Sequence, residues 1–539
     1  MKTTKTDWIK YFPFPTVRPL QEKVINEIID SFKSGKKYVL ADLPTGVGKS
    51  AIGVALANYF KDNNTNIEQK SAFLLTTQII LQEQYIRDFP YIANISAKQN
   101  YLCVNRSNGI TCDVGLTIAN VMVKMGNFKF NNYKSTCCYE IAKNRFYDEQ
   151  IGLTNLPFFL SHDRDKLMTK RSLMIVDECH NLENVVTDFA AVTFNRYFIE
   201  EILQLRWPYV SNMKIDEFIK WVNDTVLPKV ETVMATFEGK INSISGGEKG
   251  LTSQSSIGMM KKMDEFTRVK ENISTLNTSY SQNEWVLTVS DTQDIVSIKP
   301  IYASKFTERL LFNKADRVLM MSGTILDKAT FCKTNGIPEK DTHYITLESP
   351  FEIKNREVHV CNISSMGRKN IDVGLPIITE AIREILEMHK NDKGIIHTNT
   401  YKNANYINNI LANDRLLLHT SSDRRDVLNY HIDTKKPTVL VSPSFTEGVD
   451  LKGELSRFQI IAKVMYPFLG DKYTQTKMQL IKGWYEWMTV KNMIQASGRS
   501  IRDENDYCTT YILDSDFSNL LKYNKHLFPK WWLDSLIMP

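Results

Sequence analysis

The sequence predicts an α/β fold with parallel sheets in both halves of the chain. Short aliphatic or β-branched runs recur along it, and each ends in a small polar turn. Such runs, separated by longer segments, are typical of buried parallel strands joined by helices. The length of 539 residues exceeds one compact domain, and roughly two to four domains are expected. The runs lie at residues 38–41, 72–75, 173–176, 318–321, 394–396, 438–441 and 459–462.

Two stretches interrupt this pattern and look like insertions into the first α/β unit. Four of the eight cysteines lie within residues 95–150. Residues around 190–300 have a mostly helical pattern, with a Gly- and Ser-rich patch at 243–258 that predicts a loop. Elsewhere polar groups gather where the predicted strands end, which is the edge at which open α/β sheets bind ligands.

Composition and charge restrict the class of protein only weakly. The net charge of +6 permits a polyanionic partner, but an ordinary solvated surface explains it equally well. The first residues lack the apolar core of a signal peptide, and no apolar run is long enough to span a bilayer. Eight cysteines in this length do not make a secreted disulfide framework. We therefore expect a cytoplasmic protein in a reducing compartment, with no membrane contact.

A phosphate-binding loop is predicted at residues 44–50, with the sequence PTGVGKS. It follows a predicted strand and precedes a helical pattern, which is the context that such a loop requires. Glycines let backbone N–H groups wrap around phosphates, and the helix N-terminus adds positive potential. Lys49 would reach the β- and γ-phosphates of a nucleotide, and Ser50 would bind Mg²⁺. Leu43 stands where the usual pattern has its first glycine, and a plain Gly-rich turn is the alternative.

Two adjacent carboxylates, Asp177 and Glu178, follow the apolar run at 173–176. At a strand end they can take separate roles, with Asp177 holding Mg²⁺ and Glu178 polarising the attacking water. A solvated acidic turn, or Asp177 as a helix N-cap, is the alternative for either carboxylate alone. Their combination with Lys49 and Ser50 favours a site that hydrolyses a nucleotide.

A third element lies at residues 495–502, where Arg499 and Arg502 share one face of a predicted helix. From a second domain these arginines would approach the γ-phosphate and stabilise charge in the transition state. A surface pair of arginines is the alternative.

Taken together, these motifs resemble those of superfamily 2 helicases, and within them the XPD/DinG group. The resemblance extends over nearly the whole chain, because further segments match in order and spacing. The matching segments are 12–21 (an N-terminal signature with Arg18 and Gln21), 44–50 (motif I), 177–180 (a DEAH-type motif II with Cys179 in the variable place), 322–324 (motif III), 348–351 (the SPF segment), 444–451 (motif V), 463–468 (the K-x-PF strand) and 495–502 (motif VI).

The resemblance implies two RecA-like motor domains with ATP between them. The residues that it assigns to ATP are Arg18, Gln21, Thr45, Gly46, Val47, Gly48, Lys49, Ser50 and Asp450. Those assigned to catalysis are Lys49, Glu178, Gln495, Arg499 and Arg502, with Ser50 and Asp177 on Mg²⁺. Those assigned to the DNA backbone are Thr76, Thr77, Gln78, Thr398, Asn399, Thr446 and Glu447. Backbone contacts carry little sequence information, as a translocase requires.

The same resemblance divides the chain into segments. Motor domain 1 would comprise residues 1–94, 151–190 and 301–355, and motor domain 2 residues 356–539. An iron–sulfur-type insertion would occupy residues 95–150, and a mainly helical, Arch-like insertion residues 191–300.

Four cysteines of the first insertion, Cys103, Cys112, Cys137 and Cys138, offer the thiolates that a [4Fe–4S] cluster or Zn²⁺ requires. Scattered, unligated buried cysteines are the alternative. The XPD/DinG group has four cluster-binding cysteines in this place, and the segments around Cys103 and Cys138 resemble those of its first and last ligands. The chain departs from the group because Cys137 and Cys138 are adjacent, and neighbouring side chains point apart.

The first insertion is also basic and rich in aromatic residues. Basic groups follow phosphates and rings stack on bases, so this region would form a wedge beside the point of strand separation. A small core around the cysteines, which would take in part of the rings, is the alternative. The rings belong to Tyr101, Phe128, Phe130, Tyr133, Tyr139, Phe146 and Tyr147.

The implied function is an ATP-dependent helicase that moves along single-stranded DNA and opens forked duplex DNA, with the 5′ to 3′ polarity usual in the group. We expect a monomer, from a bacterium or a bacterial virus with an AT-rich genome. One alternative is a translocase or remodeller that does not separate strands. Another is a metal-stabilised nucleic-acid-binding module with a degenerate nucleotide site. The binding module is disfavoured by the intact Lys49, Ser50, Asp177, Glu178, Arg499 and Arg502.

Overall fold

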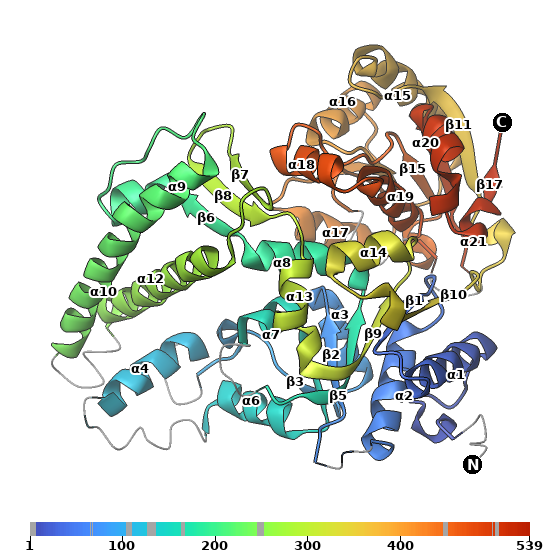
Figure 1. The fold of residues 1–539 in the computed structure, drawn as a ribbon. Coiled ribbons are helices and arrows are strands. Elements are labelled where there is room, and N and C mark those ends of the chain that lie inside the picture. Colours follow the sequence, from blue (N-terminus) through green and yellow to red (C-terminus); the bar gives the residue numbers. More distant parts are fainter. Residues whose placement is uncertain are drawn as a thin grey trace.

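Two parallel sheets of seven strands each dominate the computed structural model of the protein (Figure 1). The predicted α/β fold with two parallel-sheet domains is therefore confirmed, and each of the predicted strand runs lies in one of the two sheets. The structure describes residues 7–64, 66, 68–103, 110–124, 126, 136–162, 168–244, 253–445, 451–498, 500–501 and 506–539.

The first sheet has the strand order β10-β1-β9-β5-β2-β4-β3. Alternate residues of β1 belong to different hydrophobic clusters, Leu40 to one and Val39 to the other, so the sheet has a core on each face. Its strands are β1 (Tyr38–Asp42), β2 (Ala72–Thr76), β3 (Ala93–Asn94), β4 (Ile151–Asn155), β5 (Arg171–Asp177), β9 (Ala315–Ser322) and β10 (Thr342–Thr346). The helices around it are α1 (Pro19–Lys33), α2 (Lys49–Asp62), α3 (Ile79–Asp88), α7 (Leu156–His162), α8 (Leu182–Ala190), α13 (Ser304–Leu310) and α14 (Lys328–Asn335).

The second sheet has the strand order β13-β14-β12-β15-β16-β11-β17. Its strands are β11 (Val358–Ser364), β12 (Gly394–His397), β13 (Leu416–Leu418), β14 (Val439–Ser442), β15 (Phe458–Ile461), β16 (Thr509–Asp514) and β17 (Leu536–Ile537). The helices of this half are α15 (Ile371–Met388), α16 (Tyr401–Leu411), α17 (Arg424–Asp433), α18 (Lys472–Leu480), α19 (Trp484–Ser497), α20 (Asp516–Asn524) and α21 (Lys530–Leu533).

The second insertion is mainly helical, as predicted, but it also contains an antiparallel sheet that the sequence did not indicate. The order of that sheet is β6-β8-β7, with β6 (Val192–Asn195), β7 (Trp285–Val289) and β8 (Ile295–Pro300). The helices are α9 (Ile215–Trp221), α10 (Leu227–Asn242) and α12 (Gln254–Ser279), and α10 and α12 extend side by side away from the two large sheets (Figure 1). The predicted end of the loop at 243–258 was wrong, because α12 begins at Gln254. The Ser253 side chain caps this helix by accepting the N–H of Ser256.

The cysteine-bearing insertion contributes α4 (Cys112–Lys124) and α6 (Cys138–Asp148), which lie below the second insertion in Figure 1. Across the described ranges of the chain, no helix combines the length and the apolar character that crossing a membrane requires.

Candidate functional site

The predicted phosphate-binding loop joins β1 to α2 and has two glycines in a left-handed conformation. Gly46 and Gly48 both have φ of 87°, where a side chain is strained. A Cβ on Gly48 would also lie 2.5 Å from Nε2 of Gln21. Gln21 donates to the Val47 carbonyl at 2.9 Å, and Arg18 donates to the Gly46 carbonyl at 2.8 Å. Arg18 and Gln21 therefore buttress the loop.

Lys49 and Glu178 meet across the C-terminal edge of the first sheet. The Lys49 Nζ lies 3.3 Å from Glu178 Oε1, and both side chains are largely buried. The other carboxylate oxygen of Glu178 lies 3.2 Å from Nδ1 of His180, which in turn is 2.7 Å from the Ser322 hydroxyl. Glu178 has φ of 52°, an uncommon conformation that places its carboxylate between the lysine and the histidine.

Asp177, the last residue of β5, is held at both carboxylate oxygens. Oδ1 accepts the N–H of Glu178 at 2.9 Å, and Oδ2 accepts the hydroxyl of Tyr85 at 2.9 Å. Burial raises the pKa of Asp177 to about 6; the negative charge of Glu178 adds to the rise and Lys49 opposes it. The hydroxyl of Ser50 lies near the same phenol oxygen. Ser50 and Asp177 thus lie close together, and their hard oxygen donors fit Mg²⁺.

A helix of the second half, α19, lies across this edge. Three of its side chains, spaced four residues apart on one face, donate to motif II, to motif III and to the residue that follows motif III. The contacts are Trp487 Nε1 to the Ile325 carbonyl (3.0 Å), Lys491 Nζ to the His180 carbonyl (3.2 Å) and Gln495 Nε2 to the Thr324 hydroxyl (3.0 Å). The sequence indicated Gln495 but missed Trp487 and Lys491, although their spacing from Gln495 was visible.

Asp42, the last residue of β1, was also missed. Its buried carboxylate accepts the backbone N–H of Leu326 at 2.8 Å and the hydroxyl of Tyr344 at 3.0 Å. Burial raises the pKa of Asp42. Leu326 has φ of 63°, so this carboxylate holds the strained turn after motif III against β1.

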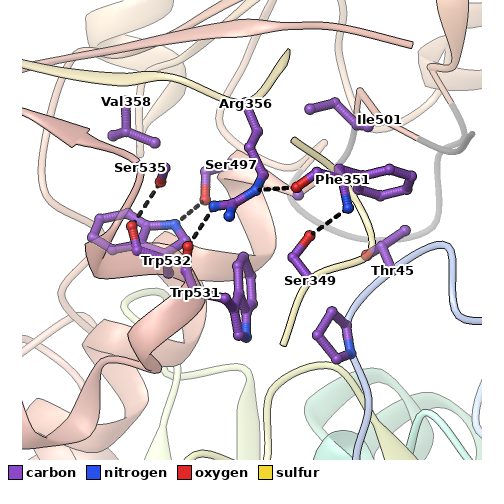
Figure 2. Close-up of a pocket in the computed structure, with 12 residues that line it drawn as sticks. Thr45, Ser349, Phe351, Arg356, Val358, Ser497, Ile501, Trp531, Trp532 and Ser535 are labelled. Carbon is purple, nitrogen blue, oxygen red and sulfur yellow. Dashed lines mark hydrogen bonds between the residues drawn. The ribbon is translucent and has the colours of Figure 1, made fainter. Parts of the chain in front are cut away.

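Figure 2 shows a pocket where the phosphate-binding loop faces the second half of the chain. The Phe351 ring packs on Gly46, since a Cβ there would lie 2.2 Å from it. The Arg356 guanidinium donates to the carbonyls of Phe351 and Trp531, and the Trp532 indole donates to the Ser497 hydroxyl at 2.8 Å. The cavity, of about 40 Å³, has room for water.

Two family descriptions match the sequence, "Helicase C-terminal domain" over residues 382–535 and "Type III restriction enzyme, res subunit" over residues 14–204. The ATP-dependent DNA helicase DinG of Photobacterium profundum is 27% identical over 264 residues, which is 45% of this chain and 37% of that protein. A probable ATP-dependent helicase of Methanocaldococcus jannaschii is 20% identical over 94% of this chain and 93% of its own length.

Among solved structures, an XPD helicase matches with a TM-score of 0.66 and 14% identity, over 98% of this chain and 100% of that chain. An apo XPD structure matches with a TM-score of 0.60 and 15% identity, over 96% and 100%. The chain is similar to XPD/DinG-like superfamily 2 helicases. The resemblance predicted from the motifs is confirmed, and at these identities the solved structures show the shared fold.

Several residues that the XPD/DinG resemblance assigned lie outside the described residues: Arg499, Arg502, Asp450, Thr446 and Glu447. Of the residues assigned to DNA, Thr76, Thr77 and Thr398 are buried. The Thr76 hydroxyl donates to the Gln78 carbonyl and that of Thr77 to the Glu178 carbonyl. The hydroxyls of Thr76 and Thr77 are thus hydrogen-bonded within the protein. Of Thr76, Thr77 and Gln78, the half-buried Gln78 is the most accessible.

The cysteines of this XPD/DinG-like chain come together only in part. Pairing of the 101–103 and 110–112 segments brings Cys103 beside Cys112. Cys112 Sγ lies 3.7 Å from Cys137 Sγ, and all three are buried in one cluster. Cys138 starts α6 and is half-buried. Thiolates are donors that iron–sulfur clusters and Zn²⁺ accept, but within the described ranges no three ligating side chains form a metal site.

The aromatic rings of the first insertion that the structure describes pack in or against its hydrophobic core. Tyr139 and Phe146 are fully buried, and Tyr101 and Tyr147 pack against the same cluster. The wedge prediction does not hold for Tyr139 and Phe146, which the core alternative explains. Tyr101 and Tyr147 are half-buried. Phe128, Phe130 and Tyr133 lie outside the described residues.

Proposed function

We propose that the chain hydrolyses ATP between its two sheets and uses the energy to move along single-stranded DNA and to open forked duplex DNA. One observation carries the proposal. Lys49 and Glu178 form an ion pair beneath α19 of the second half, and Gln495 of α19 is hydrogen-bonded to motif III. This is the arrangement expected when a nucleotide bridges two motor domains. The printed name of the Photobacterium relative, an ATP-dependent DNA helicase, supports the same activity.

In the proposed cycle Lys49 changes partner. Its ammonium lies against Glu178 here, and the β- and γ-phosphates would draw it away because they carry more negative charge. Glu178 would then accept a proton from the attacking water while His180 stays on its other oxygen. Mg²⁺, when bound, neutralises phosphate charge, and Ser50 and Asp177 would hold it.

The remaining nucleotide contacts come from both halves of the chain. Arg18, Gln21 and the loop residues Thr45, Gly46, Val47 and Gly48 would hold the adenine end and the phosphates. From the second half, Asp450, Gln495, Arg499 and Arg502 would face the γ-phosphate, and we propose Arg499 and Arg502 as the residues that stabilise its charge during transfer.

For the nucleic acid we propose single-stranded DNA with movement from 5′ to 3′. The backbone would be contacted by segments at the carboxyl ends of strands in both sheets: Thr76, Thr77, Gln78, Thr398, Asn399, Thr446 and Glu447. Since Thr76 and Thr77 use their hydroxyls internally, their contribution would come from backbone N–H groups. The six-segment division of the chain and a monomeric state belong to the same proposal.

We also propose that Cys103, Cys112, Cys137 and Cys138 bind a [4Fe–4S] cluster, with Zn²⁺ as the alternative. Support comes from the burial of three of them in one cluster and the 3.7 Å separation of Cys112 and Cys137. Anaerobic purification with visible absorption and metal analysis tests this. Brown colour with about four irons per chain supports the cluster, about one zinc per chain supports the alternative, and neither metal contradicts both.

Strand separation and its polarity are tested on forked duplexes with one tail blocked. The proposal predicts ATP-dependent release of the labelled strand when the 5′ tail is free, and none from the Glu178→Gln variant. Release only from a free 3′ tail would contradict the polarity. ATP-dependent movement along single strands without release from any fork would favour a translocase that does not separate strands.

A further inference from the structure

Tyr85 connects the segment expected to contact nucleic acid with the magnesium ligands. It lies on α3, which begins directly after Gln78, and its side chain is 1% exposed. Its hydroxyl donates to Asp177 Oδ2 at 2.9 Å and lies near the side chain of Ser50. The phenol is therefore bonded to a side chain of motif II and lies beside a side chain of the phosphate-binding helix.

The same segment makes a second contact with motif II. Strand β2 runs beside β5 with Thr76 opposite Asp177, so the chain leaving β2 passes the two carboxylate residues. The Thr77 hydroxyl donates to the backbone carbonyl of Glu178 at 3.1 Å. Glu178 holds a left-handed φ of 52°, a conformation that needs support from its surroundings.

The beginning of α3 faces solvent. Ile79 and Ile80 are 61% and 57% exposed, and Gln78 beside them is half-buried. Within ten residues the chain thus passes from an accessible surface with two apolar side chains to the interior of the nucleotide site. A ligand that displaces or orders the start of α3 would move Tyr85 with it, because both belong to one helix.

We propose that the segment from Thr77 to Tyr85 couples nucleic-acid binding to magnesium–nucleotide binding, with Tyr85 as the positioning residue. This inference rests on the proposed function. With Oδ1 held by the Glu178 N–H and Oδ2 by Tyr85, the Asp177 carboxylate is fixed in orientation, and its remaining lone pairs are left for the metal side.

The Tyr85→Phe variant removes the hydroxyl and keeps the buried ring. Loss of an outer-shell hydrogen bond typically lowers metal affinity by about 10- to 100-fold. The Mg²⁺ concentration at half-maximal binding of a fluorescent ADP analogue should rise by about that factor. Affinity for the analogue without Mg²⁺ should not change. Tyr59→Phe is the matched control, because Tyr59 is also buried but lies near the far end of α2 from Lys49.

The coupling itself is measured as the ratio of ADP-analogue affinities with and without saturating oligo(dT), at saturating Mg²⁺. Coupling is reciprocal, so oligo(dT) affinity with and without nucleotide must give the same ratio. The wild type should give a ratio different from one, and Tyr85→Phe a ratio near one. The isosteric Thr77→Val variant should reduce the ratio without moving the Mg²⁺ midpoint, and it also tests the coupling should Tyr85→Phe fail to fold.

An unchanged Mg²⁺ midpoint in Tyr85→Phe overturns its positioning role, and an unchanged ratio in both variants overturns the coupling. A wild type that does not bind oligo(dT) overturns the proposed function instead, and the Mg²⁺ midpoint then still decides the role of Tyr85.

Discussion

Replacing Lys477 with methionine is expected to loosen the contact between the two halves of the chain. Lys477 on α18 forms an ion pair with Glu183 on α8, the helix that follows motif II. Their side chains are 0% and 4% exposed. The variant would leave the Glu183 carboxylate buried without a cation, and its Oε2 has no hydrogen-bond partner among the described residues.

The cost follows from this burial. Removing one partner of a buried pair typically costs about 3–5 kcal/mol. Glu183→Leu should cost less, because the Lys477 ammonium also lies 5.2 and 4.8 Å from the ring centroids of Tyr473 and Trp484. Such cation–π contacts offset on the order of 1–2 kcal/mol of the stability lost with the ion pair. Burial also lowers the pKa of Lys477, so an unpaired lysine can lose its proton.

The double variant Lys477→Met with Glu183→Leu should lie within about 1 kcal/mol of the wild type, because an apolar pair replaces a buried ion pair at little or no cost. Hydrogen exchange of the amides in α8 and α18 measures the free energy of local opening, which suits a chain of several domains better than a global unfolding curve. Lys530→Met is the control, since its ion pair with Asp534 is exposed and should leave both helices unchanged.

The reasoning would be refuted by a double variant whose opening free energy falls by the sum of the two single losses. That result would mean that Lys477 and Glu183 act independently and that the ion pair does not join the two halves.

Three further predictions concern the loop, the interface and pH. Gly48→Ala should weaken ADP binding, measured by calorimetry, by about 10-fold or more because of backbone strain. Gly35→Ala is the control: Gly35 has φ of 91°, and no atom lies within 4 Å of the new Cβ. This variant carries strain without a clash and should leave ADP affinity unchanged. Gln495→Ala loses one hydrogen bond to Thr324, about 1 kcal/mol, and kcat should fall about 5-fold; an unchanged kcat contradicts this. Burial lowers the pKa of His431 to about 4, so below about pH 6.5 the unfolded chain binds a proton more readily than the folded chain. The thermal midpoint of unfolding should therefore be highest above that pH and fall towards pH 4. It should fall less in the His431→Gln variant.

The parts of the fold that the sequence predicts well are those set by local patterns. Central strands of both sheets, such as β1, β5 and β14, are buried on both faces, so they form continuous apolar runs. The phosphate-binding loop needs glycines at fixed positions. The second insertion was harder to predict from the sequence. Its Gly- and Ser-rich patch suggested a loop up to residue 258, yet buried side chains such as Met260 and Phe266 anchor a helix that Ser253 caps at its start.

The site was predicted where one motif carries the chemistry and missed where distant segments meet. Lys49, Asp177 and Glu178 lie in short motifs with fixed spacing. Tyr85 reaches Asp177 from 92 positions away, and Asp42 reaches Leu326 from 284 positions away, so no local pattern marks either residue. Such contacts follow from the order of strands in the sheet rather than from neighbouring residues.

The central claim is that ATP is hydrolysed at Lys49 and Glu178 in response to single-stranded DNA. Steady-state hydrolysis measured with and without oligo(dT), for the wild type and for Lys49→Ala, tests it most directly. The account predicts a rate that rises strongly with oligo(dT) in the wild type and no turnover in Lys49→Ala, which should still bind oligo(dT). Hydrolysis that survives in Lys49→Ala, or a wild-type rate that oligo(dT) does not change, would contradict it.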